Sequence, residues 1–520
     1  MMYLARNFVA LSGLLAITLA SAASTASAQS DAVTPSLIEK TAQANFREFF
    51  DLLSMPNDAI NAEDIRKNAD WLEAAFRKRG FVTMQLENNG KPLVFAEFAR
   101  KSANVKTILF YMHFDGQPVI PGQWSQKSPW ITAVKRPTPQ GQWEDIAQEK
   151  LLGEGIDPNW RIFARSSSDD KGPIMMFLTA FDVLKAANAA PTINVKVLLD
   201  SEEEKGSPRI GVVAKANREL LSADAIVIND GPIHPSNRPT IVFGNRGVTL
   251  VTLTVFGPKN PLHSGHFGNF APNPAQRLAA LLASMKDDDG RVTVAGYYDG
   301  VKLTELERRL LAEVPDDQAE LRKRIGTSRP EAVGGNYQEA LQYPSLNIRG
   351  MASAAIGDKA ANIVPSDATA EIDLRTTPGA DPAYLVKAIE AHIRARGYHL
   401  VKTVPSDEDR ATYDKIASLT VGRGSEAAFT PIDSPVGNWV QDTLAKTFAT
   451  EAGPAKTVRI RMMGGSVPTD KLVEALGLPF VIVPLVNGDN NQHSFDENLR
   501  LGQFLDGTRA FTGLLRSPYH

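Results

Sequence analysis

The sequence contains no cysteine. This absence excludes disulfide bonds, zinc sites built from thiolates and catalysis by a cysteine nucleophile. Any metal ion that the chain binds must therefore be held by histidine, aspartate or glutamate side chains.

Two further features are absent. The chain has no charge excess of one sign, since 56 Lys and Arg stand against 59 Asp and Glu, a formal net charge of -3. Such a balance offers no overall field for capturing nucleic acid or an anionic membrane. After the N-terminus there is also no apolar run long enough to cross a bilayer, the best being Ile174 to Leu184. We therefore expect a small-molecule partner, and neither nucleic acid nor membrane.

The first residues resemble an export signal. Arg6 precedes an apolar run from Phe8 to Ala20, and the small-residue motif Ala26-Ser27-Ala28 follows. We predict a signal peptide over residues 1–28, removed after Ala28, and a periplasmic location for the mature protein.

Strand-like and helix-like patterns then alternate along the chain. This alternation predicts an α/β fold with a mostly parallel sheet flanked by helices. The expected strands cover residues 81–86, 93–98, 107–112, 195–200 and 225–229, and the expected helices cover 65–80, 171–187 and 209–221.

The pattern changes at Gly247, where an alternating strand begins and a Pro/Gly-rich stretch follows it. Helical stretches are then expected over 274–284, 303–325 and 382–396, and the α/β pattern returns from about Pro435. We therefore predict that one domain is inserted into another. The main domain covers 29–246 and 430–520, and an inserted α+β domain covers 247–429.

Histidine and acidic side chains stand where apolar runs end. In open α/β sheets, ligands bind at the carboxyl ends of the strands. Taken singly, each residue has an ordinary alternative, such as a core histidine or a helix N-cap. The residues are His113 after 108–112, Asp169 before the helix at 171, Glu204 after 195–200, Asp230 after 226–228 and His493 after 480–485. Two imidazoles and three carboxylates suit two zinc ions that share a bridging carboxylate, and manganese or cobalt would also fit.

Two neighbours of these residues suggest supporting roles. Glu202, Glu203 and Glu204 would repel one another at the end of a buried strand unless a cation is present. One glutamate can then bind metal while its neighbour accepts a proton from water. Asp115, two residues after His113, is placed to accept the second ring N–H of that histidine.

The ordered motifs resemble those of the di-zinc metallopeptidase family that includes glutamate carboxypeptidase, carnosine dipeptidase, aminoacylase and succinyl-diaminopimelate desuccinylase. The resemblance covers nearly the whole chain after the signal. The motifs are His113-Phe114-Asp115, Asp169-Asp170-Lys171-Gly172, Glu203-Glu204-Lys205-Gly206-Ser207, Asp230, His263-Ser264-Gly265, Asp373-Leu374-Arg375, Gly464-Gly465-Ser466 and His493-Ser494.

The resemblance implies a catalytic domain of the zinc exopeptidase type and makes the inserted domain a lid that dimerises. It implies Glu203 as general base, with Asp115 as a further catalytic residue, and a cis peptide bond between Asp169 and Asp170. The implied metal ligands are Asp169 as the bridge, His113 and Asp230 on one ion, and Glu204 and His493 on the other.

The resemblance also assigns residues of the inserted and C-terminal segments. His263 is implied to reach the active site of a partner subunit and stabilise the oxyanion, which implies a homodimer. Arg375, Gly465 and Ser466 are implied to bind the substrate carboxylate. A structural ion pair is an equal alternative for Arg375.

These observations predict an exopeptidase, either a dipeptidase or a carboxypeptidase. It would hydrolyse a peptide bond of a dipeptide or short peptide next to a free carboxylate, with a water between two zinc ions and a glutamate base. An N-acyl amino acid deacylase is the alternative within the enzymes. From another class, the chain could be a non-catalytic periplasmic binding protein on a hydrolase fold.

Overall fold

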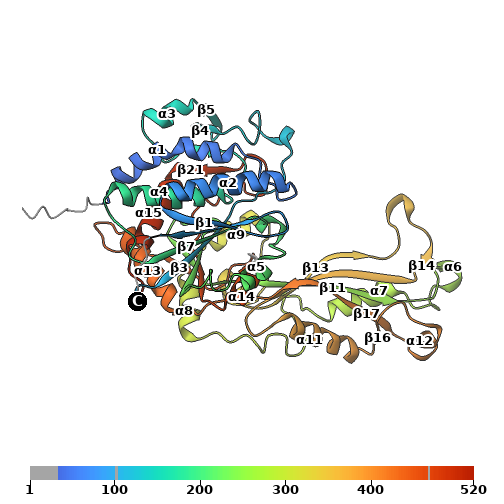
Figure 1. Cartoon of the computed structure of the whole chain (residues 1–520). Helices are drawn as coiled ribbons and strands as arrows, with labels where there is room; N and C mark the ends of the chain where they lie inside the picture. The colour runs from blue at the N-terminus through green and yellow to red at the C-terminus, as the bar shows by residue number, and fades with distance from the viewer. Residues whose placement is uncertain (1–32, 100–103, 466–468) are drawn as a thin grey trace, which may run out of the picture.

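The computed structural model describes residues 33–99, 104–465 and 469–520. The chain has two parts (Figure 1). We call the part built on an eight-stranded sheet the body (33–245 and 428–520), and the elongated part built on a five-stranded sheet the arm (246–427).

The body sheet is parallel at its centre and antiparallel toward one edge. Strands β7, β3, β8 and β20 run parallel, whereas β1 and β2 pair antiparallel with their neighbours. The predicted α/β fold with a mostly parallel sheet is confirmed. In spatial order the strands are β1 (Phe81–Leu86), β2 (Leu93–Phe98), β7 (Asn194–Asp200), β3 (Thr107–His113), β8 (Ala225–Ile228), β20 (Phe480–Ile482), β9 (Thr240–Val242) and β19 (Val458–Ile460).

Helices cover both faces of this sheet. In β3, Phe110 packs into the larger core while Tyr111 packs into the core on the opposite face. Every residue of β3 after Thr107 is buried, as expected for a central strand covered on both sides. The larger core is covered by α1 (Pro35–Leu53), α2 (Ala62–Lys78), α4 (Lys171–Ala186), α13 (Pro435–Thr447) and α15 (Leu501–Arg516), and the other by α5 (Ile210–Ala216) and α14 (Thr469–Leu476).

A small antiparallel sheet lies at the edge of the body. It joins strands from before and after the arm, since β21 pairs with β6. Its strands are β21 (Asn498–Arg500), β6 (Arg161–Phe163), β4 (Ala133–Pro137) and β5 (Trp143–Ile146), and the neighbouring short helices are η1 (Pro121–Gln123), α3 (Gln148–Gly153) and η2 (Glu203–Lys205).

The arm is a five-stranded sheet with helices on one face. Alternate residues of the central strand β11 are buried, and Val251, Leu253 and Val255 pack against the helices. Helix α11 begins after the N-cap Asp381 and buries Leu385 and Ile389, one turn apart. In order the strands are β13 (Ser345–Ala352), β15 (Asp367–Thr376), β11 (Gly247–Phe256), β17 (Ile416–Ser425) and β16 (His399–Val401), and the helices are α7 (Pro274–Ala283) and α11 (Pro382–Ala395).

The chain enters and leaves the arm at neighbouring positions. Strand β10 (Gly244–Asn245) pairs antiparallel with β18 (Ala428–Phe429). The predicted limits of the inserted domain, 247 and 429, fall at this pair, and the division into domains stays a prediction.

The helix expected over 303–325 is two helices, α8 (Glu305–Glu313) and α9 (Gln318–Ile325). Val314 is extended and Pro315 follows it, and a residue before proline disfavours the helical conformation. Two contacts hold this segment on the body: Glu307 accepts from Arg461 Nε at 2.5 Å, and Asp316 lies 3.1 Å from His234 Nε2.

The remaining elements are short. They include β12 (Leu262–His263), α6 (Ser264–Phe267), α10 (Tyr337–Ala340), η3 (Gly357–Lys359), β14 (Ile363–Val364) and α12 (Asp407–Thr412). Among the described residues, no helix is long and apolar enough to cross a bilayer.

Candidate metal centre

The five predicted metal ligands lie together at the carboxyl edge of the body sheet. They form two groups that share Asp169: His113 and Asp230 lie with it on one side, and Glu204 and His493 on the other. Within each group the candidate ligand atoms lie within 4.8 Å of one another. The parallel strands explain this convergence, because β3, β7 and β8 end at the same edge.

Asp169 lies between the two histidines. Its Oδ1 is 2.9 Å from His113 Nε2, and its Oδ2 is 3.1 Å from His493 Nε2. His493 Nε2 is also 3.3 Å from Glu204 Oε2. The Asp169–Asp170 peptide bond is cis, as the resemblance predicts. His493 has a φ of 61°, an uncommon backbone conformation that is concentrated at functional sites.

Asp115 supports both histidine and glutamate. It is fully buried, and its two carboxylate oxygens accept hydrogen bonds from the backbone N–H groups of Glu203 at 2.9 Å and Glu204 at 3.1 Å. Its Oδ1 is 3.4 Å from His113 Nδ1, while the Asp115 carbonyl oxygen is closer, at 3.2 Å. Asp115 therefore fixes the turn that carries both glutamates and lies beside the histidine ring.

The acidic groups have shifted pKa values because they are buried together. Burial, followed by the charge of Asp169, raises the pKa of Glu204 to about 7, and burial raises that of Asp230 to about 6. Burial also raises the pKa of Glu203 well above its usual range, and the charges of Asp230 and Glu204 add to the rise. Hydrogen bonds from both histidines overcome burial at Asp169 and hold its pKa low. Such a group of carboxylates is stabilised by cations.

Glu497, which the sequence did not identify, holds the segment before Asp169. Its carboxylate is fully buried. Oε1 accepts from the backbone N–H groups of Ser168 and Asp169, both at 2.9 Å, and Oε2 accepts from Ser166 N–H at 2.8 Å and Arg165 Nη1 at 2.7 Å. Burial raises the pKa of Glu497, and the positive charge of Arg165 opposes that rise. The only sequence signal is an acid four residues after His493.

Two more residues hold the glutamate turn. Asp200, the last residue of β7, accepts from Tyr111 Oη and Glu202 N–H at 3.0 Å each, and from the Ser207 hydroxyl. Gln117 Nε2 donates to Glu204 Oε2 at 2.7 Å. Asp200 could have been identified from the sequence, because it is an acid at the end of a buried strand. No sequence pattern marks Gln117.

His263 does not join this group within one chain. It lies in β12 and is exposed, and its Nδ1 accepts from Gly265 N–H at 3.1 Å. Figure 1 shows α6 and β14, which flank it, at the end of the arm farthest from the body.

Two of the predicted substrate-binding residues, Arg375 and Gly465, belong to the described residues. Arg375 is the residue before the last of β15 and is half-buried. Its Nε is 3.8 Å from Asp373 Oδ1, which is too long for a close ion pair. Gly465 is exposed beside Met463. Ser466 lies outside the described residues.

The comparisons with known proteins find relatives among the metallopeptidases. Residues 243–400 match the peptidase dimerisation domain of the M20 family. The chain is 26% identical over 450 residues to the Cys-Gly metallodipeptidase of Schizosaccharomyces pombe, covering 85% of this chain and 86% of the relative. It is 24% identical to the human Beta-Ala-His dipeptidase, covering 81% and 76%.

A solved structure is similar over a still larger share of the chain. The M20 metallo-carboxypeptidase of Sulfolobus solfataricus has a TM-score of 0.67 and 26% identity, covering 91% of this chain and 98% of that one. The chain is a homologue of the M20 metallopeptidases. The predicted recognition, fold and enzyme class are therefore confirmed: the chain is a homologue of metal-dependent peptidases, which are hydrolases.

The predicted periplasmic location is wrong by the same comparison. The relatives from fission yeast, budding yeast and human are dipeptidases of eukaryotic cells and not bacterial exported proteins. They lend no support to a signal peptide either, and residues 1–28 lie outside the described residues.

Proposed function

We propose that this M20 homologue is a dipeptidase that hydrolyses the peptide bond of a dipeptide or short peptide next to a free carboxylate. The observation that carries the proposal is the Asp169 carboxylate, whose two oxygens contact His113 and His493 separately. The relatives named for Cys-Gly and Beta-Ala-His supply the substrate class.

The donor set fits two zinc ions, with manganese or cobalt as chemical alternatives. Two ligands about 2.1 Å from a tetrahedral zinc ion are about 3.4 Å apart. The ligand atoms of His493, Asp169 and Glu204 are 3.1 and 3.3 Å apart, close to that value. Asp169 would bridge the ions, His113 and Asp230 would hold one, and Glu204 and His493 the other.

Glu203 is proposed as the general base. Two divalent ions in the site would bring the pKa of a water between them toward 7 and polarise a substrate carbonyl. Glu203 takes the proton from that water and passes it to the leaving amine. The Asp115 carboxylate accepts a hydrogen bond from the backbone N–H of Glu203 and so holds Glu203 in place.

The inserted segment predicted over 247–429, which is nearly the same as the arm, is proposed as a lid and dimerisation domain between the catalytic segments 29–246 and 430–520. The match to a dimerisation domain supports a homodimer. His263, at the far end of the arm, would reach the site of the partner subunit and stabilise the oxyanion. Arg375, Gly465 and Ser466 would receive the substrate carboxylate, since a guanidinium pairs well with a carboxylate.

The test is a comparison of Glu203→Gln with wild type. Both proteins are stripped with a chelator, reloaded with zinc, manganese or cobalt, and analysed for metal content. Hydrolysis is then measured on Cys-Gly, on Beta-Ala-His and on N-acetyl amino acids. Glu203→Gln should bind both metals and lose roughly 10²–10⁴-fold in turnover, the usual contribution of a general base.

Glu202→Gln is the matched control. The Glu202 carboxylate accepts from Asn88 at 3.0 Å and pairs with Lys91, and neither partner is a candidate ligand. Removing the charge of Glu202 should therefore leave turnover nearly unchanged. Unchanged turnover in Glu203→Gln would remove the base assignment. Hydrolysis of N-acetyl amino acids but of no dipeptide would make the protein a deacylase.

A further inference from the structure

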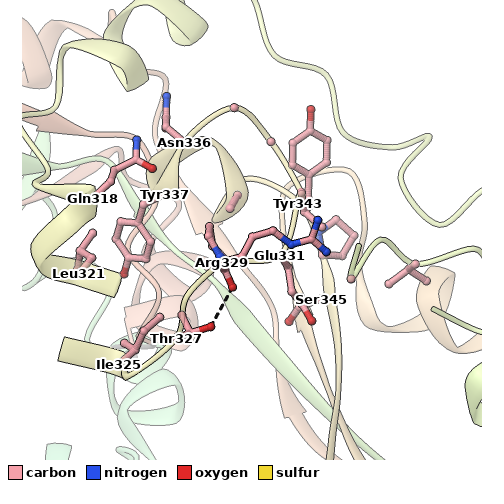
Figure 2. Close-up of a pocket in the computed structure, with 18 of the residues that line it drawn as sticks. Gln318, Leu321, Ile325, Thr327, Arg329, Glu331, Asn336, Tyr337, Tyr343 and Ser345 are labelled. Carbon is pink, nitrogen blue, oxygen red and sulfur yellow. Dashed lines mark hydrogen bonds between the residues drawn. The ribbon is translucent and has the colours of Figure 1, made fainter. Parts of the chain in front are cut away.

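A cavity of about 470 Å³ lies in the arm, lined by residues between Arg246 and Leu346. It is bounded by α9, by the loop that follows it, and by the start of β13. Figure 2 shows Leu321, Ile325 and Tyr337 grouped on one side, and Tyr343 and Ser345 on the other. The cavity is therefore built mainly by the segment that connects α8 to the five-stranded sheet.

The wall formed by α9 is apolar and uncovered. No residue of α9 is buried, Ile325 is 64% exposed, and Tyr337 nearby is 44% exposed. Apolar side chains that gather around a cavity mark a binding site, whereas single exposed ones do not.

The lining carries more positive than negative charge. Arg246, Lys286, Arg322 and Arg329 line the cavity, and Glu331 is its one carboxylate among the described residues. Glu331 pairs with Lys286 at 2.6 Å, and Arg329 pairs with Asp289 outside the cavity at 3.1 Å. Arg246 Nη2 donates to the Tyr343 carbonyl at 2.8 Å. Burial, followed by the charge of Arg375, lowers the pKa of Arg246 to about 10, while the charge of Asp373 partly opposes that change. Two guanidinium groups so placed favour an anionic group between them.

The cavity also adjoins the candidate substrate-binding residues. Ser345, in its lining, is the direct strand partner of Arg375. The Arg246 N–H donates to the Met463 carbonyl at 3.2 Å, one residue before Gly464. A side chain placed on Gly464 would contact Leu341, which follows α10. The cavity is thus a continuation of the region that holds Arg375 and Gly465.

We propose that this cavity receives the C-terminal residue of the substrate, with an apolar or aromatic side chain against Leu321 and Tyr337 and the carboxylate at Arg246 beside Arg375. The proposal rests on the proposed peptidase function and adds a preference to it: dipeptides that end in leucine or phenylalanine bind better than those that end in glycine.

The first experiment compares kcat and KM on Ala-Gly and Ala-Phe for the metal-loaded wild type, Tyr337→Ala and Tyr413→Ala. Tyr413 is the matched control, because it is 42% exposed and stacks on His399 elsewhere in the arm. Tyr337→Ala should raise KM for Ala-Phe about 10-fold, equivalent to about 1.4 kcal/mol, and change Ala-Gly less than about 2-fold. Tyr413→Ala should change neither. Equal effects of Tyr337→Ala on both dipeptides would overturn the proposal.

A second variant guards against a folding defect. Ile325→Glu changes an exposed side chain and adds a negative charge at the cavity, so it should raise KM for Ala-Phe and leave kcat unchanged. An unchanged KM would contradict the assignment.

A binding measurement separates this proposal from the proposed function. Calorimetry with L-phenylalanine and glycine should show binding of phenylalanine only, and Ile325→Glu should weaken it about 10-fold. Phenylalanine should also inhibit dipeptide hydrolysis competitively, whereas non-competitive inhibition would make the cavity an effector site and overturn the proposal. If no dipeptide is hydrolysed, the proposed function fails while calorimetry still decides about the cavity.

Discussion

Replacing Glu497 with glutamine tests how the metal centre is held. Glu497 accepts four hydrogen bonds, two on each carboxylate oxygen. A glutamine keeps one acceptor oxygen and turns an NH₂ group toward the other two donors, so two hydrogen bonds are lost. Each hydrogen bond to a charged group contributes about 1.5–3 kcal/mol. Arg165 is one of the four donors, so this loss overlaps with the broken buried ion pair, which typically costs about 3–5 kcal/mol as a whole.

We therefore expect Glu497→Gln to lower the free energy of unfolding by about 3–5 kcal/mol, measured by denaturant unfolding of the metal-free protein. The backbone of Asp169 is one of the four donors, so metal affinity should fall as well. Loss of a group that orients a metal ligand weakens binding about 10- to 100-fold. Competition with a chromophoric chelator would measure that loss.

Glu307→Gln is the control for this prediction. Glu307 pairs with Arg461 at 2.5 Å, with both side chains nearly buried, but it is not among the candidate ligands or their partners. It should lose stability and keep metal affinity. Metal affinity equal to wild type in Glu497→Gln, or an equal loss in both variants, would refute the positioning role of Glu497.

Three further predictions concern the same centre. Asp115→Asn should weaken metal binding about 10- to 100-fold, because Asp115 lies beside His113 and holds both glutamates, and chelator competition would show it. Metal affinity should fall as the pH is lowered from 8 to 6. Over this range Glu204, with a pKa of about 7, and Asp230, with a pKa of about 6, become protonated, and each must release its proton before it can bind metal. Calorimetry in two buffers of different ionisation enthalpy would count the protons released. The inactive variants His263→Ala and Glu203→Gln should be mixed and allowed to exchange subunits. About a quarter of wild-type activity should return, because half of the dimers then contain one complete site out of two. No recovery of activity would place His263 outside the partner's site.

Most of the candidate ligands could be found in the sequence because they follow or precede a strongly patterned element, and the structure brings them together. His113 and Asp230 close buried strands whose order in a parallel sheet brings them to one edge. His493 lies eleven residues after β20, in an irregular loop, so spacing alone could not place it.

Other features depend on contacts that no local pattern reveals. Glu497 acts on backbone N–H groups more than 300 residues earlier in the chain. The cavity beside α9 joins segments from Arg246 to Leu346, which lie far apart in the sequence. The roles of Glu203, Arg375 and Gly465 remain predictions, because position alone does not establish a chemical role.

The pairing of β10 with β18 has a consequence for how such a protein can change. Residues 245 and 428 are neighbours, so the 182 residues between them form an inserted segment that leaves and re-enters the body at one place. All five candidate ligands lie outside that inserted segment. Substitutions, extensions or losses within the arm can therefore alter which peptides are accepted, and how two copies associate, without disturbing the order of the strands that gather the ligands. The metal ligands and the proposed side-chain cavity are thus encoded in separate stretches of the chain, free to diverge at different rates, while the role proposed for His263 would still tie the arm to the reaction.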